Sequence, residues 1–430
     1  MTVQLWMAIP FALLLLLIAV APLLFPEFCE SNRNKFIVTA IIAVPTAVVM
    51  TLLGLGAPVL HQVLFDYIPF MTLLLTLYVI TGGIQIKGDM VATPVVNSGI
   101  LLVGFFLASL MGTTGAAMLL IRFLLDTNSQ RKYRTHTVLF FIAMVANCGG
   151  ILTPLGDPPL FLLYLRGAPF TWFAQLAPQW ALTGLILLTV YYCVDHHYYK
   201  KEPIGNKMRD VRQFSPVRFK GKINFIYLIF VILGVMFLNE TYVPAMGEHG
   251  PLSFLREYLF AILIVLSLKT TPKSIRKINN FSWDPVAEVA ILFLGIFVTM
   301  TPALMYLYQH AADLGLSRPW EFFYATGMLS SFLDNSPTAV AFYEVALGLG
   351  NAEGAATVAG ISPVLLEAIS LGAVFFGALT YIGNGPNFMV KSIAEQEGIK
   401  MPSFFGYMAK FSLCILLPVY ILVQLIFLPF

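Results

Sequence analysis

The chain of 430 residues has few charged side chains: Asp, Glu, Lys and Arg together make up 11% of it, whereas 58% of the residues are hydrophobic. A soluble protein has about a quarter charged residues. This scarcity of charge excludes a soluble globular protein. The sequence also lacks the short alternating segments of a transmembrane β-barrel and has long apolar runs instead. These features predict an all-α polytopic membrane protein.

Other features that are missing narrow the function further. The four cysteines are scattered without the spacing of a metal or redox motif. No Walker A motif is present, which argues against ATP-driven pumping. No Lys or Arg precedes the first apolar run, residues 5–25, so we expect a retained first span with its N-terminus outside instead of a signal peptide.

The segment from Asn147 to Pro159 combines helix breakers with an ionisable side chain. It holds three prolines and three glycines, and a helix does not run undisturbed through such a sequence. The apolar runs beside it, 137–145 and 160–165, are each too short to span a bilayer, but together they suffice. We therefore predict one transmembrane helix that is broken at mid-membrane. Asp157 lies in the break, and an ionisable residue at that depth marks a functional site.

A second segment repeats the first. Residues 153–161 and 380–388 both fit the pattern T-x-[LI]-G-x-x-P-x-F, and each interrupts an apolar segment in its own half of the chain. One such nonapeptide would be weak evidence, but two in the same register indicate an internal duplication.

The distribution of charge predicts the remaining topology. Plain spans are expected near residues 5–25, 36–59, 67–86, 174–195, 223–240, 253–269, 285–309 and 404–428. Segments 97–125 and 318–350 are also apolar, but polar residues cut their middles, so we predict re-entrant hairpins with their tips at mid-membrane. Cytoplasmic loops carry an excess of Lys and Arg. If 97–125 is a hairpin, the basic loop after it and the basic connector 200–222 both lie in the cytoplasm.

Each half then has five crossings and one re-entrant hairpin. Because five is an odd number, the second half is inserted upside down, which gives the two inverted repeats of secondary transporters, with broken helices at the midplane. The N-terminal repeat spans 1–199, the cytoplasmic basic connector 200–222 and the C-terminal repeat 223–430. We expect a multi-pass protein of the inner (plasma) membrane with both termini outside.

The two hairpin tips and the two breaks are expected to meet and to form the site. Helix breaks free backbone carbonyls, which suit alkali cations together with hydroxyls, amides and carboxylates, whereas the N-terminal stumps suit anions. The candidate ion- or substrate-binding residues are Thr113, Thr114, Asn147, Thr153, Asp157, Asp334, Asn335, Ser336, Thr338, Thr380, Asn384 and Asn387.

Asp157 and Asp334 are the candidate Na⁺ ligands. A buried carboxylate is costly unless it is paired, protonated or bound to a cation. Two carboxylates in one site would let Na⁺ and H⁺ compete for the same oxygens. Asp334 also has the position of an N-cap for the second leg of its hairpin, and the hydroxyls of Thr153 and Thr380 could serve the freed backbone alone.

These motifs resemble the ion transporter superfamily, which includes divalent anion/sodium symporters, citrate transporters, arsenite permeases and NhaD-type sodium/proton antiporters. The resemblance covers roughly residues 60–428. Asn147-x-Gly-Gly followed by Thr-Pro-Leu-Gly-Asp157, and the segment Leu333-Asp334-Asn335-Ser336-Pro337, are most similar to the NhaD type. The divalent anion symporters instead carry Ser-Asn-Thr at both hairpin tips. Pro158-Pro159 and the Gly-Pro-Asn of residues 385–387 are more similar to those symporters.

The sequence predicts a secondary active membrane transporter, and of three mechanisms the first, sodium/proton antiport, is the main prediction. The first is exchange of Na⁺ for H⁺ without an organic substrate, and the second is sodium- or proton-coupled uptake of citrate or another small carboxylate. Export of arsenite or an oxyanion is a third. The resemblance implies a homodimer. We expect no enzymatic activity and no cofactor, with Na⁺ and H⁺ as transported or coupling ions. The expected surroundings are the lipid bilayer, and no nucleic acid partner is expected.

Overall fold

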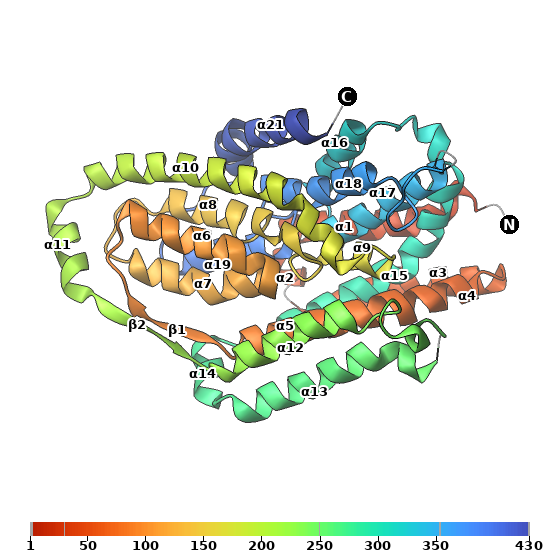
Figure 1. Ribbon diagram of the computed structural model, residues 1–430, viewed down its shortest axis with the longest axis horizontal. Coiled ribbons are helices and arrows are strands. Elements are labelled where there is room, and N and C mark those ends of the chain that lie inside the picture. The colour runs from red at the N-terminus through yellow and green to blue at the C-terminus, as the bar shows by residue number, and fades with distance from the viewer. Residues whose placement is uncertain (1–2, 30, 249, 352–353, 429–430) are drawn as a thin grey trace.

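The computed structural model describes residues 3–29, 31–248, 250–351 and 354–428, and nearly all of its regular structure is helical. Within those ranges, eight helices are long and apolar enough to cross a membrane. Most helix axes run along the long dimension of the molecule (Figure 1). This agrees with the predicted all-α polytopic membrane protein.

The plain spans form where the long apolar runs occur. In the first half they are α1 (Ile9–Leu24), α3 (Asn32–Leu52), α4 (Gly56–His61) with α5 (Ile68–Thr81), and α10 (Ala177–Lys201). In the second half they are α12 (Ile223–Phe237), α13 (Leu255–Thr270), α15 (Asp284–Gln309), and α20 (Phe404–Tyr407) with α21 (Leu417–Phe427). Two of these spans contain π-helical segments, Gln62–Tyr67 and Met408–Leu416. The sequence patterns gave no sign of these segments.

The first hairpin consists of α6 (Pro94–Met111) and α7 (Thr113–Thr127), which pack side by side (Figure 1). A single residue, Gly112, joins them, with a φ of 81° that L side chains rarely adopt. Thr93 caps the start of α6 by accepting a hydrogen bond from the backbone N–H of Val96. Because α6 and α7 pack side by side and a single residue joins them, the two outer ends of the hairpin lie on the same side, as the hairpin prediction requires.

The second hairpin consists of α16 (Pro319–Ser330) and α17 (Asn335–Leu349). Its tip is wider than that of the first, because four residues separate the two helices, and Asp334 caps the second leg. In Figure 1 the two hairpins occupy opposite halves of the molecule, and each directs its tip toward the middle.

Both predicted broken helices are broken. The first runs as α8 (Thr135–Met144), a 3₁₀ turn at Cys148–Leu152 and α9 (Pro158–Leu165). The second runs as α18 (Pro363–Phe376), a 3₁₀ turn at Gly377–Leu379 and α19 (Gly385–Gln396). Proline stands in the first turn of α9 and of α19, where its missing N–H costs nothing.

The two halves make the same contacts around their breaks. Thr153 Oγ1 donates to the carbonyl of Ser109, at the end of α6, and Thr380 Oγ1 donates to the carbonyl of Ser331, at the end of α16. Each threonine hydroxyl also accepts the backbone N–H two residues later, at 3.2 Å in both breaks. Each break is thus joined to the hairpin of its own half in the same way, which supports the duplication read from the nonapeptides.

Polar contacts between loops place the connections at two ends of the molecule. At one end, Asn279 Nδ2 donates to the carbonyl of Gly82 at 2.9 Å, so the loops after α5 and α13 meet. At the other end, the backbone N–H of Val3 donates to Gln309 Oε1 at 2.9 Å, so the start of the chain meets the end of α15. The assignment of these connections to opposite ends of the molecule follows the predicted order of crossings.

The basic connector is more ordered than the sequence indicated. It forms α11 (Ile204–Gln213) and β2 (Ser215–Lys220), and β2 pairs antiparallel with β1 (Gln85–Asp89). Asp210 Oδ2 accepts the backbone N–H of Ala92 at 2.9 Å. The connector is therefore fastened to the segment that leads into the first hairpin, and in its strand Val217 and Phe219 alternate with Arg218 and Lys220.

Candidate functional site

The candidate site lies where the two hairpin tips and the two helix breaks meet. Asp157 occupies its centre, with only 1% of its surface exposed. The residue has extended backbone geometry and directly precedes α9. Pro158 and Pro159 follow it and fix the direction in which the half-helix leaves the break.

The carboxylate of Asp157 accepts a hydrogen bond from each of the other three breaks. Thr113 Oγ1, from the tip of the first hairpin, donates to Oδ1 at 2.7 Å. Asn335 Nδ2, from the tip of the second hairpin, donates to Oδ2 at 2.5 Å. Asn384 Nδ2, from the second broken helix, donates to Oδ1 at 3.1 Å. One carboxylate thus joins four segments that are far apart in the sequence.

All three donors to Asp157 are neutral. Among the described residues, the ion pairs include none with Asp157. Hydroxyl and amide donors offset only part of the cost of burying a full negative charge. The geometry therefore favours a proton or a bound cation at this carboxylate.

A second layer of amides surrounds the centre. Asn147 Nδ2 donates to Asn387 Oδ1 at 2.7 Å and to the carbonyl of Ile142 at 2.8 Å. Asn387 Nδ2 donates in turn to the carbonyls of Gly377 and Thr380, at 2.8 and 2.9 Å. These bonds hold the two breaks against each other and satisfy backbone carbonyls that the broken helices leave without partners.

The tip of the second hairpin has a clear structural role as well. Asp334 Oδ1 accepts the backbone N–H of Ser336 at 2.9 Å, which is an N-cap of α17. Thr338 Oγ1 donates to the carbonyl of Asp334 at 2.9 Å, and Ser336 Oγ contacts Asn335 Oδ1 at 3.4 Å. Asp334 is half-buried, and it is not one of the three residues that donate a hydrogen bond to Asp157.

The threonines divide into two groups. Thr113 contacts Asp157 directly and is bound through its own backbone N–H to the carbonyl of Gly156 at 2.8 Å. Thr114 lines a cavity beside the centre. Thr153 and Thr380 instead donate to hairpin carbonyls within their own halves, so their hydroxyls stabilise the breaks.

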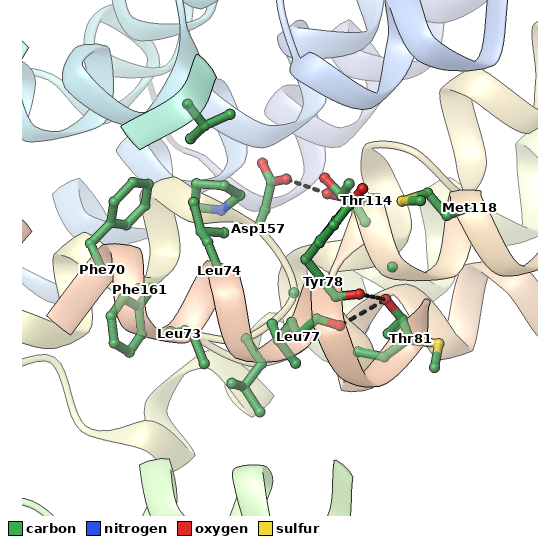
Figure 2. Close-up of a pocket in the computed structure, with 18 of the residues that line it drawn as sticks. Phe70, Leu73, Leu74, Leu77, Tyr78, Thr81, Thr114, Met118, Asp157 and Phe161 are labelled. Atoms are coloured by element: carbon green, nitrogen blue, oxygen red, sulfur yellow. Dashed lines mark hydrogen bonds between the residues drawn. The ribbon is translucent and has the colours of Figure 1, made fainter. Parts of the chain in front are cut away.

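A cavity of about 160 Å³ reaches Asp157. Figure 2 shows Leu74, Leu77 and Tyr78 of α5 along one wall, with Asp157 and Thr114 across from them. The lining extends to Thr81 at the end of α5 and to the first turn of α15, at the end of the molecule where the small sheet lies. The residues that line it are mainly apolar and include no Lys, Arg or His.

Basic residues near the breaks are engaged elsewhere. Arg166, at the end of α9, pairs with Asp66 at 3.3 Å and with Glu344 at 3.4 Å. Lys391 pairs with Glu395, one turn further along α19. Neither pair places a cationic side chain at Asp157.

Some parts of the site could not be found from the sequence. The carbonyl groups of Ala146, Ser109 and Ser331 bind site residues through the backbone, so no side-chain pattern marks them. The wall formed by α5 also lies in an ordinary apolar span. Apart from threonines, Tyr78 is its polar side chain, and the Tyr78 hydroxyl donates to the carbonyl of Ser282 at 2.7 Å.

Two hairpins and two broken helices that meet around a buried polar centre define a helical membrane transporter of the secondary type. The chain belongs to the family described as "Putative citrate transport", whose family model matches residues 1–428. This family lies within the citrate and divalent anion part of the ion transporter superfamily, in agreement with the resemblance read from the breaks. A comparison with curated proteins finds no match to this chain.

Proposed function

We propose that the protein couples the movement of Na⁺ or H⁺ to that of citrate or a related small carboxylate, with Asp157 as the coupling residue. The observation that carries this proposal is the set of three hydrogen bonds to Asp157 from Thr113, Asn335 and Asn384. Because each donor belongs to a different break, a proton or cation at this carboxylate acts on both hairpins and both broken helices at once.

The energetics of burial support a cation or proton as the coupling partner. Asp157 is buried among neutral donors, and the described ion pairs do not include it. An intramembrane carboxylate in that setting is stabilised when it is protonated or when a cation binds. Loss of the cation would weaken the centre and favour rearrangement of the four segments, which is the requirement for coupled transport.

Two features support a carboxylate as cargo. The family description names citrate transport. In addition, α7, α9, α17 and α19 all begin at the centre. Helix N-termini carry partial positive charge and bind anions such as carboxylates. Four such ends could receive an anion without an arginine or lysine.

A second candidate function is exchange of Na⁺ for H⁺ without organic cargo. The specific observation in its favour is the cavity beside Asp157, whose lining is mainly apolar and includes no basic side chain. Such a cavity suits a small cation better than a molecule with several carboxylates. Asp334, one residue before Asn335, would then be the second titrating group.

Everted membrane vesicles loaded with a pH-sensitive or a Na⁺-sensitive fluorescent dye distinguish the two functions. Citrate added without a change in Na⁺ should produce a proton or sodium flux in vesicles that contain the protein, and none in vesicles that lack it. A response to Na⁺ or Li⁺ alone, unchanged by citrate, would support the antiport candidate and contradict carboxylate transport.

A further inference from the structure

The side-chain nitrogen of Asn384 lies among three oxygens. Nδ2 is 3.1 Å from Asp157 Oδ1, 3.2 Å from Asn147 Oδ1 and 3.2 Å from the carbonyl oxygen of Ala146. An amide group has two hydrogens to donate, so three acceptors share two protons. The reverse orientation of the amide would be worse, because it would place Oδ1 against the same three oxygens.

Asn384 also has a special place in the duplicated sequence. The nonapeptides align Thr153 with Thr380 and Gly156 with Gly383, so Asp157 and Asn384 are equivalent positions. The two side chains are hydrogen-bonded to each other and both are buried, with 1% and 4% of their surfaces exposed. The repeat therefore places a charged oxygen ligand in one half and a neutral one opposite it in the other.

From this cluster we infer a Na⁺ site between the two broken helices, formed by Asp157 Oδ1, Asn147 Oδ1, the Ala146 carbonyl and Asn384. In the present arrangement, the Asn384 amide nitrogen occupies the position of the ion. When Na⁺ binds there, the Asn384 side chain moves out of that position and turns so that Oδ1, in place of Nδ2, faces the ion as the fourth oxygen. The inference rests on the proposed coupling role of Asp157 and specifies the ion and its ligands.

The ligand set selects a monovalent ion. Its donors are one carboxylate, one side-chain amide on each side and one backbone carbonyl, which together carry a single negative charge. Divalent cations are usually held by several carboxylates or by retained water. The described residues also contain no group of three or more His, Cys, Asp or Glu that could hold a metal ion. One Na⁺ would neutralise Asp157 and leave the centre without net charge.

Thermal unfolding of the purified protein tests the site without any transport assay. NaCl is raised while choline chloride keeps the ionic strength constant. Because a ligand that binds only the folded state stabilises it, the unfolding midpoint of the unmodified protein should rise with the Na⁺ concentration. Asn384→Leu should lose this rise. Asn384→Ser, which keeps one oxygen, should need about fivefold more Na⁺ for half of the effect.

Asp66→Asn is the matched control, because Asp66 is also a buried acid but pairs with Arg166 away from the centre. It should keep the full Na⁺-dependent rise. An unmodified protein that unfolds alike in NaCl and choline chloride would overturn the inference. An unchanged Na⁺ response of the Asn384→Leu or the Asn384→Ser variant would overturn it as well.

The test separates this site from the coupling role of Asp157. If Na⁺ does not stabilise the protein but Asp157→Asn abolishes proton-coupled flux, the Na⁺ site is wrong and the proposed function stands. If Asp157→Asn keeps coupled flux, the proposed function itself fails.

Discussion

The hydroxyl of Thr113 donates a 2.7 Å hydrogen bond to Oδ1 of Asp157, and thereby joins the tip of the first hairpin to the first broken helix. The same residue is fixed by its backbone N–H, which donates to the carbonyl of Gly156. The hairpin tip is therefore sensitive to the state of the carboxylate. A proton or cation that withdraws charge from Oδ1 changes the strength of the hydroxyl bond and thereby acts on the tip.

Thr113→Val tests this link, because valine keeps the shape of threonine but cannot donate. A hydrogen bond to a charged group contributes about 1.5–3 kcal/mol, so the affinity for the coupling cation should change by at least about tenfold. Concentration dependence of the gradient-driven flux measures the change. Thr72→Val is the control, because the Thr72 hydroxyl donates to Ile68 in its own helix. Equal effects of both variants would contradict a specific role of Thr113.

Asp334→Asn separates the capping role of Asp334 from a coupling role. Asparagine is as good an N-cap as aspartate, so the variant should insert and keep its thermal stability. We expect it to lose cation-dependent flux, as the sequence prediction of a second coupling carboxylate requires. Flux and unfolding midpoint, measured on the same preparation, give the answer. Full activity of Asp334→Asn would leave Asp334 with a capping role alone.

The ion pairs of Arg166 are expected to stabilise the end of the molecule opposite the small sheet. Arg166 joins α9 to Asp66, in the π-helical segment before α5, and to Glu344 of α17, and all three side chains are mostly buried. Arg166→Gln leaves two acids without their cation and should destabilise the protein by about 3 kcal/mol. Thermal unfolding in detergent measures this.

Lys391→Gln provides the comparison, because its pair with Glu395 lies partly exposed on one helix face. Its loss should cost no more than about 0.5 kcal/mol. An Arg166→Gln variant as stable as Lys391→Gln would show that the buried pairs contribute nothing.

The excess of Lys and Arg at the end with the small sheet predicts that this end faces the cytoplasm. In a background without native cysteines, Lys207→Cys on α11 should be protected from an impermeant thiol reagent in intact cells. Thr241→Cys, after α12, should react. Thr241 is exposed and Lys207 is half-buried, so neither position is fully buried and burial alone does not explain a complete difference in labelling. The reverse labelling pattern would invert the orientation.

The sequence predicts the fold where local physics determines it. Apolar runs determine the spans, and the Pro and Gly residues of 147–159 and 380–388 determine the breaks. The single Gly112 and the cap at Asp334 mark the hairpin tips. What escapes prediction depends on contacts between distant residues. The pairing of β1 with β2 joins residues more than 120 positions apart, and the alternation of Val217 and Phe219 with Arg218 and Lys220 does not identify the partner strand.

The candidate site shows the same limit. Sequence reasoning selected Asp157, Thr113, Asn335 and Asn384, and the structure brings these four together. The sequence offered Asp334 as an N-cap, but it could not show that Asn335 contacts the carboxylate of Asp157 and Asp334 does not, because neighbouring residues at a helix start point in different directions. The backbone carbonyl of Ala146 has no sequence signature at all.

The most direct test of the account is Asp157→Asn in reconstituted liposomes. Asparagine keeps the shape and one acceptor oxygen, but it neither releases a proton nor balances a cation. Uptake of labelled citrate is measured with an inward Na⁺ or H⁺ gradient and without one. We predict that the variant inserts and folds but shows no gradient-driven accumulation, whereas the unmodified protein accumulates citrate under one of the gradients. Gradient-driven accumulation by Asp157→Asn at the unmodified rate would contradict the central role of this carboxylate.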